Sequence, residues 1–485
     1  MRTERVRLSR GWSRLTAAGV SSASDTTTGF DGASRTSASA GWLLWAIVGV
    51  ALLPFVISAV VLLVEVGSSV HAFDDNALNE LHTRDVGHHL VVLGPYSRDA
   101  WNHLGPAMYY LLAVPYRLTG SNSVGMYVGA LLINAVAVAG MLVIAYRRGG
   151  LPVCLLVGLG LAMVVRSLGE SFLRDPWNPY VTVLPFGLFL FTVWELVAGR
   201  CWALPGAAGI ATFLVQTHVG YVPLAVPLLI GGTAWLIAVN RRQGRGETAG
   251  DGQPRGLTRA VAATGAVLLI MWIPPVIGII RGSPGNLATA VHYFLSGNAA
   301  HGLIDGYRVL AEQFSARPEW LVGPQAANPF SGQPDFVVHA PVPWLIIPLG
   351  LAGWWLSRRG ITEAWRLGAV VAAALLLGVL AVARTIGPIY AYRLRWTWLL
   401  GMLGGVLVLW TGWALVMRVS GSATFVRSGC VLVAVLMVVV SATNGASATR
   451  TSVPDGEESS ILGQLFPRVL RALPSRPGVV ITTAA

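Results

Sequence analysis

Long runs of apolar residues recur along the chain and are separated by short polar segments. Several runs reach the roughly 20 residues that an α-helix needs to cross a bilayer. A transmembrane β-barrel would instead show short segments that alternate apolar and polar residues. The pattern therefore predicts an all-α polytopic membrane protein. Eleven spanning helices are expected, over residues 42–66, 122–146, 151–168, 179–199, 202–217, 219–239, 259–280, 342–357, 366–383, 395–417 and 425–443.

Charge in the connections predicts how these helices are oriented. Residues 1–41 are rich in Ser, Thr, Ala and Arg, and we expect them to form a disordered cytoplasmic tail. Every even-numbered connection then also carries arginine, from Arg147 and Arg148 to Arg418 and Arg427. Most acidic residues fall in the odd-numbered connections, as the positive-inside rule requires of outward loops. We therefore predict a plasma-membrane protein with a transmembrane module over 42–444 and an extracytoplasmic carboxyl-terminal tail over 445–485.

Two outward connections are long, over residues 67–121 and 281–341. The stretch 102–118 is apolar but short and holds two internal prolines, so we expect a helix that lies on the outer surface of the membrane. Amphipathic patterns predict further surface helices over 286–297, 302–314 and 74–85, where Ala77, Leu78 and Leu81 share one face. The sequence of the carboxyl-terminal tail predicts one helix and a lone strand. These either pack on the outer loops or belong to a domain that is cut short here.

Composition narrows the class of function. Apolar residues make up 54% of the chain and charged residues 12%, with a net charge of +12. The chain has no lysine, and its arginines lie largely between apolar runs, which indicates topology-setting charge and no nucleic acid partner. Cys154, Cys201 and Cys430 show no metal-site spacing and are expected to pack as small apolar residues. Phosphate-binding and dinucleotide-binding glycine motifs are absent from the sequence.

Adjacent carboxylates, Asp74 and Asp75, follow the first apolar run directly. Asp175 lies in a very short connection between the third and fourth predicted helices, which also faces outward. The alternative is a solvated loop or a helix cap. Two carboxylate sites that converge from different loops suit a general base together with a metal or donor-positioning group. We therefore predict Asp74, Asp75 and Asp175 as catalytic residues, and Asp75 and Asp175 as ligands of a divalent cation such as Mg, Mn or Ca.

Three arginines flank the last outward connection before residue 400: Arg384, Arg393 and Arg395. Snorkelling to the membrane interface is the alternative role. The planar guanidinium also pairs with two phosphate oxygens at once, so these arginines are candidates for binding a phosphodiester or pyrophosphate. Tyr390 and Tyr392 lie between them and are candidates for contact with a lipid headgroup or a sugar.

His103, Gln216 and His218 are expected at the outer ends of their helices. A hydrogen-bonded structural role is the alternative for each, and we predict them as further substrate-binding residues.

Four segments together resemble the GT-C superfamily of glycosyltransferases, which use polyprenyl-phosphate sugars. They are "HAFDDNALNE", "HLGPAMYYLLAVPYRLTG", "RDPWNPYVTVLPF" and "WIPPVIGIIRGSPGNLATAVHYF". The protein O-mannosyltransferase and aminoarabinose transferase branch looks most similar, and the likeness covers roughly residues 42–420. It implies a GT-C-like helical bundle in which one carboxylate of the 74–75 pair deprotonates an acceptor hydroxyl for inverting attack on the anomeric carbon. This pair is often Asp-Glu in the family but is Asp-Asp here, as in the arabinofuranosyltransferase branch, which leaves the sugar open.

The leading hypothesis is therefore a membrane glycosyltransferase that acts on the outer face. It would transfer a sugar from a polyprenyl-phosphate donor in the lipid bilayer to a hydroxyl of a cell-envelope glycan, lipid or protein. A multi-pass transporter or lipid flippase is the alternative, although the sequence shows no internal repeat. A membrane scaffold with a degenerate site is the third hypothesis.

Overall fold

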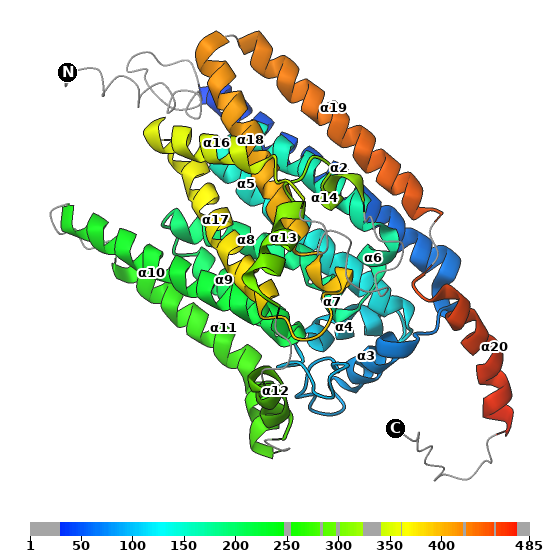
Figure 1. Ribbon diagram of the computed structural model, residues 1–485. Helices are drawn as coiled ribbons and strands as arrows, with labels where there is room; N and C mark the ends of the chain where they lie inside the picture. Colours follow the sequence, from blue (N-terminus) through cyan, green and yellow to red (C-terminus); the bar gives the residue numbers. More distant parts are fainter. Residues whose placement is uncertain are drawn as a thin grey trace.

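The computed structural model is a bundle of α-helices (Figure 1). It describes residues 30–246, 254–281, 285–296, 301–323, 341–359, 361–420, 423–450 and 453–472, and these contain no β-strand. The helices of the first half are α2 (Phe30–Val61), η1 (Leu62–Val66), η2 (Gly67–Ser69), α3 (Asp74–Asp85), α4 (Ala107–Leu118), α5 (Val124–Leu168), α6 (Glu170–Arg174), α7 (Asn178–Val181), α8 (Val183–Val197), α9 (Ala203–Thr217), η3 (Val219–Tyr221) and α10 (Val222–Gly246). The second half contains α11 (Pro254–Arg281), α12 (Gly285–Leu295), α13 (Leu303–Glu312), α14 (Glu319–Val322), α16 (Ile346–Arg359), α17 (Thr362–Ala383), η4 (Ala391–Leu394), α18 (Thr397–Ser420), α19 (Ala423–Ala448) and α20 (Gly456–Ala472).

Each of the eleven apolar runs falls on a helix. Eight helices of the described residues are long and apolar enough to cross a membrane, with α5 counted once, and α9 and α16 are shorter apolar helices. The protein is therefore an all-α, multi-pass membrane protein, while the number of crossings stays a prediction. The predicted tail boundary at residue 41 lies inside α2, which begins at Phe30. Residues 1–29 lie outside the described residues.

Helix α5 is a hairpin of two antiparallel arms. Gly150 interrupts it with φ 69° and ψ −165°, in a region of backbone space that glycine enters without steric cost. The arms meet beyond this turn, because the thiol of Cys154 lies 3.6 Å from the carbonyl oxygen of Leu142. The break that the sequence predicts between residues 146 and 151 is thus confirmed.

The two arms of α5 form the centre of the bundle. Helices α2 and α19 pack against them and against each other, and α8 and α18 also pack on α5. Helix α9 continues this packing outward from α8 to α10 and α11, and α17 contacts α8, α10 and α18. Large aromatic side chains fill the interior, including Trp194, Phe186 and Trp398, each fully buried. This packing holds the helix ends in fixed relative positions.

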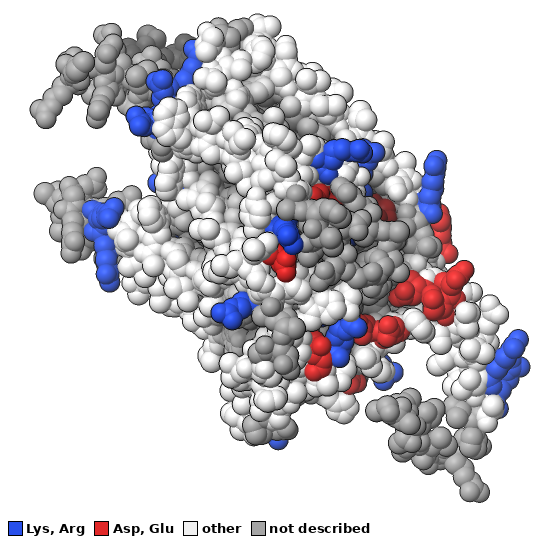
Figure 2. Space-filling view, in the orientation of Figure 1, with Lys and Arg blue, Asp and Glu red and all other residues white. Residues whose placement is uncertain are grey.

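The two ends of the bundle differ in charge. The amino-terminal end of α2, the carboxyl-terminal ends of α10, α16 and α18, and the amino-terminal ends of α11, α17 and α19 lie toward one end, which we call the basic end (Figure 1). Helices α3, α4, α12 and α20 lie toward the other, which we call the acidic end (Figure 1). Figure 2 shows most of the visible acidic side chains gathered there. The helix ends beside three predicted even-numbered connections thus lie opposite the helices of the predicted outward loops, and the side that each faces in the cell stays a prediction.

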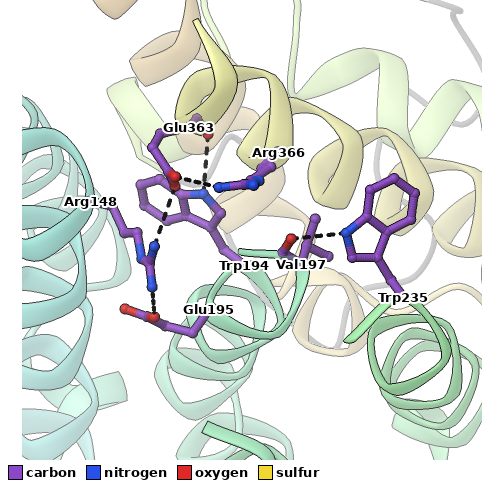
Figure 3. A network of polar contacts seen from close by, with 7 residues as sticks. All are labelled: Arg148, Trp194, Glu195, Val197, Trp235, Glu363 and Arg366. Atoms are coloured by element: carbon purple, nitrogen blue, oxygen red, sulfur yellow. Dashed lines mark hydrogen bonds and ion pairs between the residues drawn. The ribbon is translucent and has the colours of Figure 1, made fainter. Parts of the chain in front are cut away.

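A buried ion-pair network joins three helices (Figure 3). Arg148 of α5 pairs with Glu195 of α8 and lies 3.7 Å from a carboxylate oxygen of Glu363 of α17. Arg366 pairs with the same Glu363 at 2.5 Å, and the indole of Trp194 donates to the Glu363 carbonyl. Arg148 therefore cross-links three helices, and Arg366 holds the Glu363 carboxylate from within α17, in addition to carrying the charge that predicts topology.

Surface helices cover the acidic end. One of them, α3, buries polar residues and exposes apolar ones, which is the reverse of a surface helix in a soluble protein. Helix α3 has the predicted bounds, but its buried side carries Asn76, Asn79 and Thr83, whereas Leu78 and Leu81 are 44% and 46% exposed. An apolar face turned outward suits a helix whose surroundings are lipid. The predicted surface helices over 102–118, 286–297 and 302–314 correspond to α4, α12 and α13, and the tail helix corresponds to α20. The predicted tail strand lies outside the described residues.

Candidate functional site

A cavity of about 620 Å³ opens at the acidic end. Its walls come from the start of α3, the loop before α4, the start of α7, the turn after α9, α12, and the segment from the end of α17 to the start of α18. Seven of the residues predicted from the sequence line it: Asp74, Asp75, His103, His218, Arg384, Tyr392 and Arg393. Segments more than 300 residues apart in sequence therefore meet around one space.

The acidic wall begins where α3 begins. Asp74 is the first helical residue and has φ 48°, a left-handed conformation that Asp tolerates better than most residues. The next residue, Asp75, accepts a hydrogen bond of 2.8 Å from the indole N–H of Trp177. Burial raises the pKa of Asp75, the Trp177 hydrogen bond opposes this, and the neighbouring Asp74 raises the pKa further. Asp75 is thus a fixed carboxylate with an increased affinity for a proton.

Asp175 lies behind this wall and does not line the cavity. Its Oδ1 accepts hydrogen bonds from the side-chain amide of Asn76 at 2.9 Å and from the backbone N–H of Trp177 at 3.0 Å. It therefore ties α3 to the loop that carries the indole contacting Asp75. Burial raises the pKa of Asp175 to about 7, against the effect of these two hydrogen bonds.

Three arginines line the cavity: Arg98, Arg384 and Arg393. Arg98 lies with its guanidinium carbon 4.9 Å from the ring centre of Tyr390, and hydrogen bonds to the tyrosine hydroxyls raise its pKa. Arg393 donates to the Tyr392 hydroxyl at 3.3 Å and lies 4.0 Å from a carboxylate oxygen of Asp99. The side chain of Arg384 makes no hydrogen bond or ion pair with the described residues and is exposed.

The tyrosines act as supports for this basic group. The rings of Tyr390 and Tyr392 are stacked with their centres 5.5 Å apart, and Arg393 also lies over both. Tyr392 lines the cavity, whereas Tyr390 lies behind it and contacts the guanidinium groups of Arg98 and Arg393. Cation–π contact of this kind holds a guanidinium in place without neutralising its charge.

Two predicted residues are placed elsewhere. Arg395 is buried and pairs with Glu319 of α14 at 3.3 Å, and Trp398 donates to the same carboxylate. This pair packs α14 against α18, away from the cavity lining. Gln216 is fully buried, and its amide donates to the carbonyl of Met271 at 2.8 Å. Neither residue lines the cavity.

His103 and His218 lie side by side, with ring centres 4.9 Å apart. Nδ1 of His103 accepts from the backbone N–H of Val219 at 3.1 Å, and Nδ1 of His218 accepts from that of Gly220 at 3.2 Å. Burial lowers the pKa of His103 well below its usual value and that of His218 to about 3. Both rings are therefore neutral near pH 7, with the proton on Nε2.

Sequence reasoning missed several lining residues. They are Tyr96, Arg98, Asp99, Trp101, Trp177, Tyr293, Phe294 and Trp396. Most are aromatic, and flat aromatic faces suit contact with the C–H faces of a sugar ring or with a lipid chain. A signal for two of them was available, because Trp177 is two residues from Asp175 and Arg98 lies in the first outward loop. Trp101 and Trp396 also lie within two residues of His103 and Arg395, but a lone aromatic residue in an apolar segment has no signature that marks it as part of a site.

The described residues hold no group of three or more His, Cys, Asp or Glu side chains that could bind a metal ion. Of the two predicted metal ligands, Asp75 lines the cavity and Asp175 does not. A cation bound by both would also compete with the hydrogen bonds that Asp175 already accepts.

Comparison with known proteins gives only distant likenesses. No family model and no curated protein matches the chain. Two of the solved structures that match are states of one protein. ArnT from Cupriavidus metallidurans bound to undecaprenyl phosphate is 14% identical with a TM-score of 0.49, and its apo state is 13% identical with a TM-score of 0.48. Each alignment covers 90% of this chain and 81% of the other.

Proposed function

We propose that this protein is a membrane glycosyltransferase that transfers a sugar from a polyprenyl-phosphate donor to a hydroxyl group. One observation carries the proposal. A positioned carboxylate, Asp75, and three arginines line the same cavity at the acidic end of a membrane bundle. Transfer from a phosphate ester needs this pair of features: a base for the acceptor and positive charge for the departing phosphate.

The reaction follows from the charges. The Asp75 carboxylate takes the proton of the acceptor hydroxyl as that oxygen forms a bond to the anomeric carbon. The bond from the anomeric carbon to the phosphate oxygen breaks, and its electron pair stays on the polyprenyl phosphate, which gains a negative charge. Attack from the face opposite the phosphate inverts the anomeric configuration. Arg98, Arg384 and Arg393 stabilise the charge that develops on the phosphate.

Other residues position these groups. The Trp177 indole orients Asp75, and Asp175 holds Trp177 and α3 together. We therefore assign Asp175 a positioning role. The arginines proposed to bind the donor phosphate include Arg98 and no longer include Arg395. The neutral His103 and His218 keep Nε2–H donors at the cavity wall, which suit hydrogen bonds to sugar hydroxyls.

The structure adds one constraint on the substrates, which is the size of the cavity. The volume of about 620 Å³ suits one sugar ring with its phosphate and an acceptor group. We propose a pentose or hexose donor and an acceptor hydroxyl on a cell-envelope glycan, lipid or protein. The divalent cation predicted from the sequence is a separate proposal, and comparing activity in EDTA with activity in Mg²⁺ or Mn²⁺ tests it.

The test is a transfer assay with purified protein in lipid nanodiscs. Labelled polyprenyl-phosphate mannose, arabinofuranose and aminoarabinose are supplied with envelope acceptor fractions, and the glycosylated product is measured. Asp75→Asn is expected to reduce turnover at least 100-fold, and Arg393→Gln is expected to reduce kcat/KM for the donor about tenfold. Asp85→Asn and Arg84→Gln are matched controls, because both lie at the far end of α3 and outside the cavity lining. Full activity of Asp75→Asn would refute the proposal, as would uptake of substrate without a covalent product.

A further inference from the structure

A second cavity, of about 280 Å³, lies between the end of α5, the start of α6 and the last turns of α19. It shares no lining residue with the cavity described above. Its polar lining comes from Arg166 and Glu170 on one side and from Thr443, Asn444 and Ser447 of α19 on the other. Polar walls on a helix that otherwise carries apolar residues are unusual at a lipid-facing surface.

Glu170 is the buried charged group of this cavity. Its side chain is only 5% exposed, and its Oε2 makes no hydrogen bond with the described residues. Burial raises the pKa of Glu170 to about 7, although Arg174 and Ser58 favour the charged form. Arg174 directs its own donors to Ser58 at 2.7 Å and to the carbonyl of Ala448 at 2.5 Å. A carboxylate oxygen left without a donor in a buried site costs stability, so a ligand with N–H donors would compensate it.

Arg166 lies at the rim of the same cavity, in the last turn of α5, and Gly169 separates this helix from Glu170 at the start of α6. The side chain of Arg166 is exposed and makes no hydrogen bond or ion pair with the described residues. The cavity thus presents a buried acceptor and, at its opening, a cationic donor. A ligand that matches both carries a protonated amine and, a few atoms away, a phosphate.

The position of the opening points to the membrane as the source of the ligand. Thr443 and Ser447 are exposed, and α19 carries exposed Val435, Val438 and Val439 on the turns that lead to them. Only 11% of the apolar stretch of α19 is buried, so most of this helix is exposed on the outside of the bundle, although one side packs on α2 and α5. A lipid beside α19 would therefore bring its headgroup to the cavity.

We propose that this second cavity binds the headgroup of an aminophospholipid such as phosphatidylethanolamine. The protonated primary amine donates to Glu170, and the phosphate accepts from Arg166. Asn444 and Thr443 complete the polar wall around the linking atoms. The site is separate from the proposed glycosyltransferase cavity and does not depend on its activity.

Lipid binding by the purified, delipidated full-length protein tests this directly. Phosphatidylethanolamine, phosphatidylglycerol and phosphatidylcholine are titrated separately, and bound lipid is counted by native mass spectrometry. We expect one molecule of phosphatidylethanolamine to bind at least tenfold more tightly than phosphatidylglycerol, which lacks the amine, or phosphatidylcholine, whose amine has no N–H. Soluble glycerophosphoethanolamine is a further arm. If it binds as tightly as the lipid, the ligand is a free zwitterion and the lipid assignment is wrong.

Variants separate a binding role from a structural one. Glu170→Gln is expected to remove the preference for phosphatidylethanolamine, and Arg166→Gln is expected to weaken binding of all three phospholipids about tenfold. Thr443→Trp fills the opening without changing a charge and is expected to block binding of phosphatidylethanolamine. This variant tests the proposal even where Glu170→Gln does not fold. Arg84→Gln and Asp85→Asn are the matched controls, because neither residue lines either cavity, and both variants should bind lipid as the parent protein does. Equal affinity of all three lipids for the parent protein, or an unchanged preference in Glu170→Gln, would overturn the proposal.

Discussion

The sharpest prediction concerns the hydrogen bond between Trp177 and Asp75. The substitution Trp177→Phe removes the indole N–H that donates to the carboxylate at 2.8 Å. It keeps an aromatic ring for the contacts with Tyr180 and Tyr392, whose ring centres lie 4.9 and 4.8 Å away. The change therefore tests the hydrogen bond more than the packing.

The expected size follows from the environment of Asp75. A hydrogen bond to a charged group contributes roughly 1.5–3 kcal/mol, and a partly exposed carboxylate falls at the low end of this range. Since 1.36 kcal/mol is a factor of ten in rate, we expect kcat/KM near pH 7 to fall about tenfold. The direction of the pH effect is also fixed. The indole N–H stabilises the ionised form and lowers the pKa of Asp75, so its loss raises that pKa. The acid limb of the pH–rate profile should move to higher pH.

The assay is the transfer reaction measured from pH 5 to pH 9 with a saturating acceptor. Trp101→Phe is the matched control, because Trp101 also lines the cavity but its indole nitrogen has no partner among the described residues. This variant should keep the acid limb of the parent protein. The reasoning is wrong if Trp177→Phe leaves the acid limb in place, or if both variants shift it equally.

Three further predictions concern charge and the tail. Arg393→Gln should raise the KM for the donor about tenfold without lowering the melting temperature, whereas Arg395→Gln should lower the melting temperature because it breaks the buried ion pair with Glu319, at a cost of about 3–5 kcal/mol. A melt of each variant in detergent, beside donor titrations, distinguishes the two roles, and equal effects on KM would contradict the assignment. Because the pKa of Asp175 is raised to about 7 in the folded state, the folded form holds its proton more tightly than the unfolded chain. Stability should therefore fall as the pH rises from about 4 to about 7, and Asp175→Asn should show a smaller difference between melts at pH 5 and pH 8. Phe466 is 55% exposed on the apolar side of α20, so Phe466→Glu should detach this helix from lipid and speed hydrogen exchange over residues 456–472 in nanodiscs, and an unchanged rate would contradict this.

Periodicity and composition predicted the helical class well, because a bilayer imposes a length and an apolar surface that are visible in sequence. The hairpin of α5 was predicted from a short polar break, and the glycine at position 150 supplies its turn. The orientation of α3 was harder. Its apolar residues mark a face, but whether that face turns inward depends on what surrounds the helix. Leu78 and Leu81 turn outward, and Asn76 and Asn79 turn inward.

The site was predicted in part because its acidic residues follow a helix directly. Asp75 and Arg393 were both named as candidates from the sequence, and the fold brings them to one cavity, while their roles stay predictions. Sequence could not separate Arg393 from Arg395, since two neighbouring arginines point in different directions once a short helix and α18 form. Likewise, Asp175 was visible as an acid, but its contact with Trp177 depends on a loop conformation that has no sequence signature.

The histidine pair constrains how any later kinetic profile is interpreted. Nδ1 of each imidazole accepts a hydrogen bond from a backbone N–H group of the same turn, and burial keeps both rings uncharged. Neither ring can then supply the ionisation that enzymologists commonly ascribe to histidine between pH 6 and 7. An inflection in that interval would therefore not report either of these imidazoles, and the chemical shifts of both rings should remain constant across it.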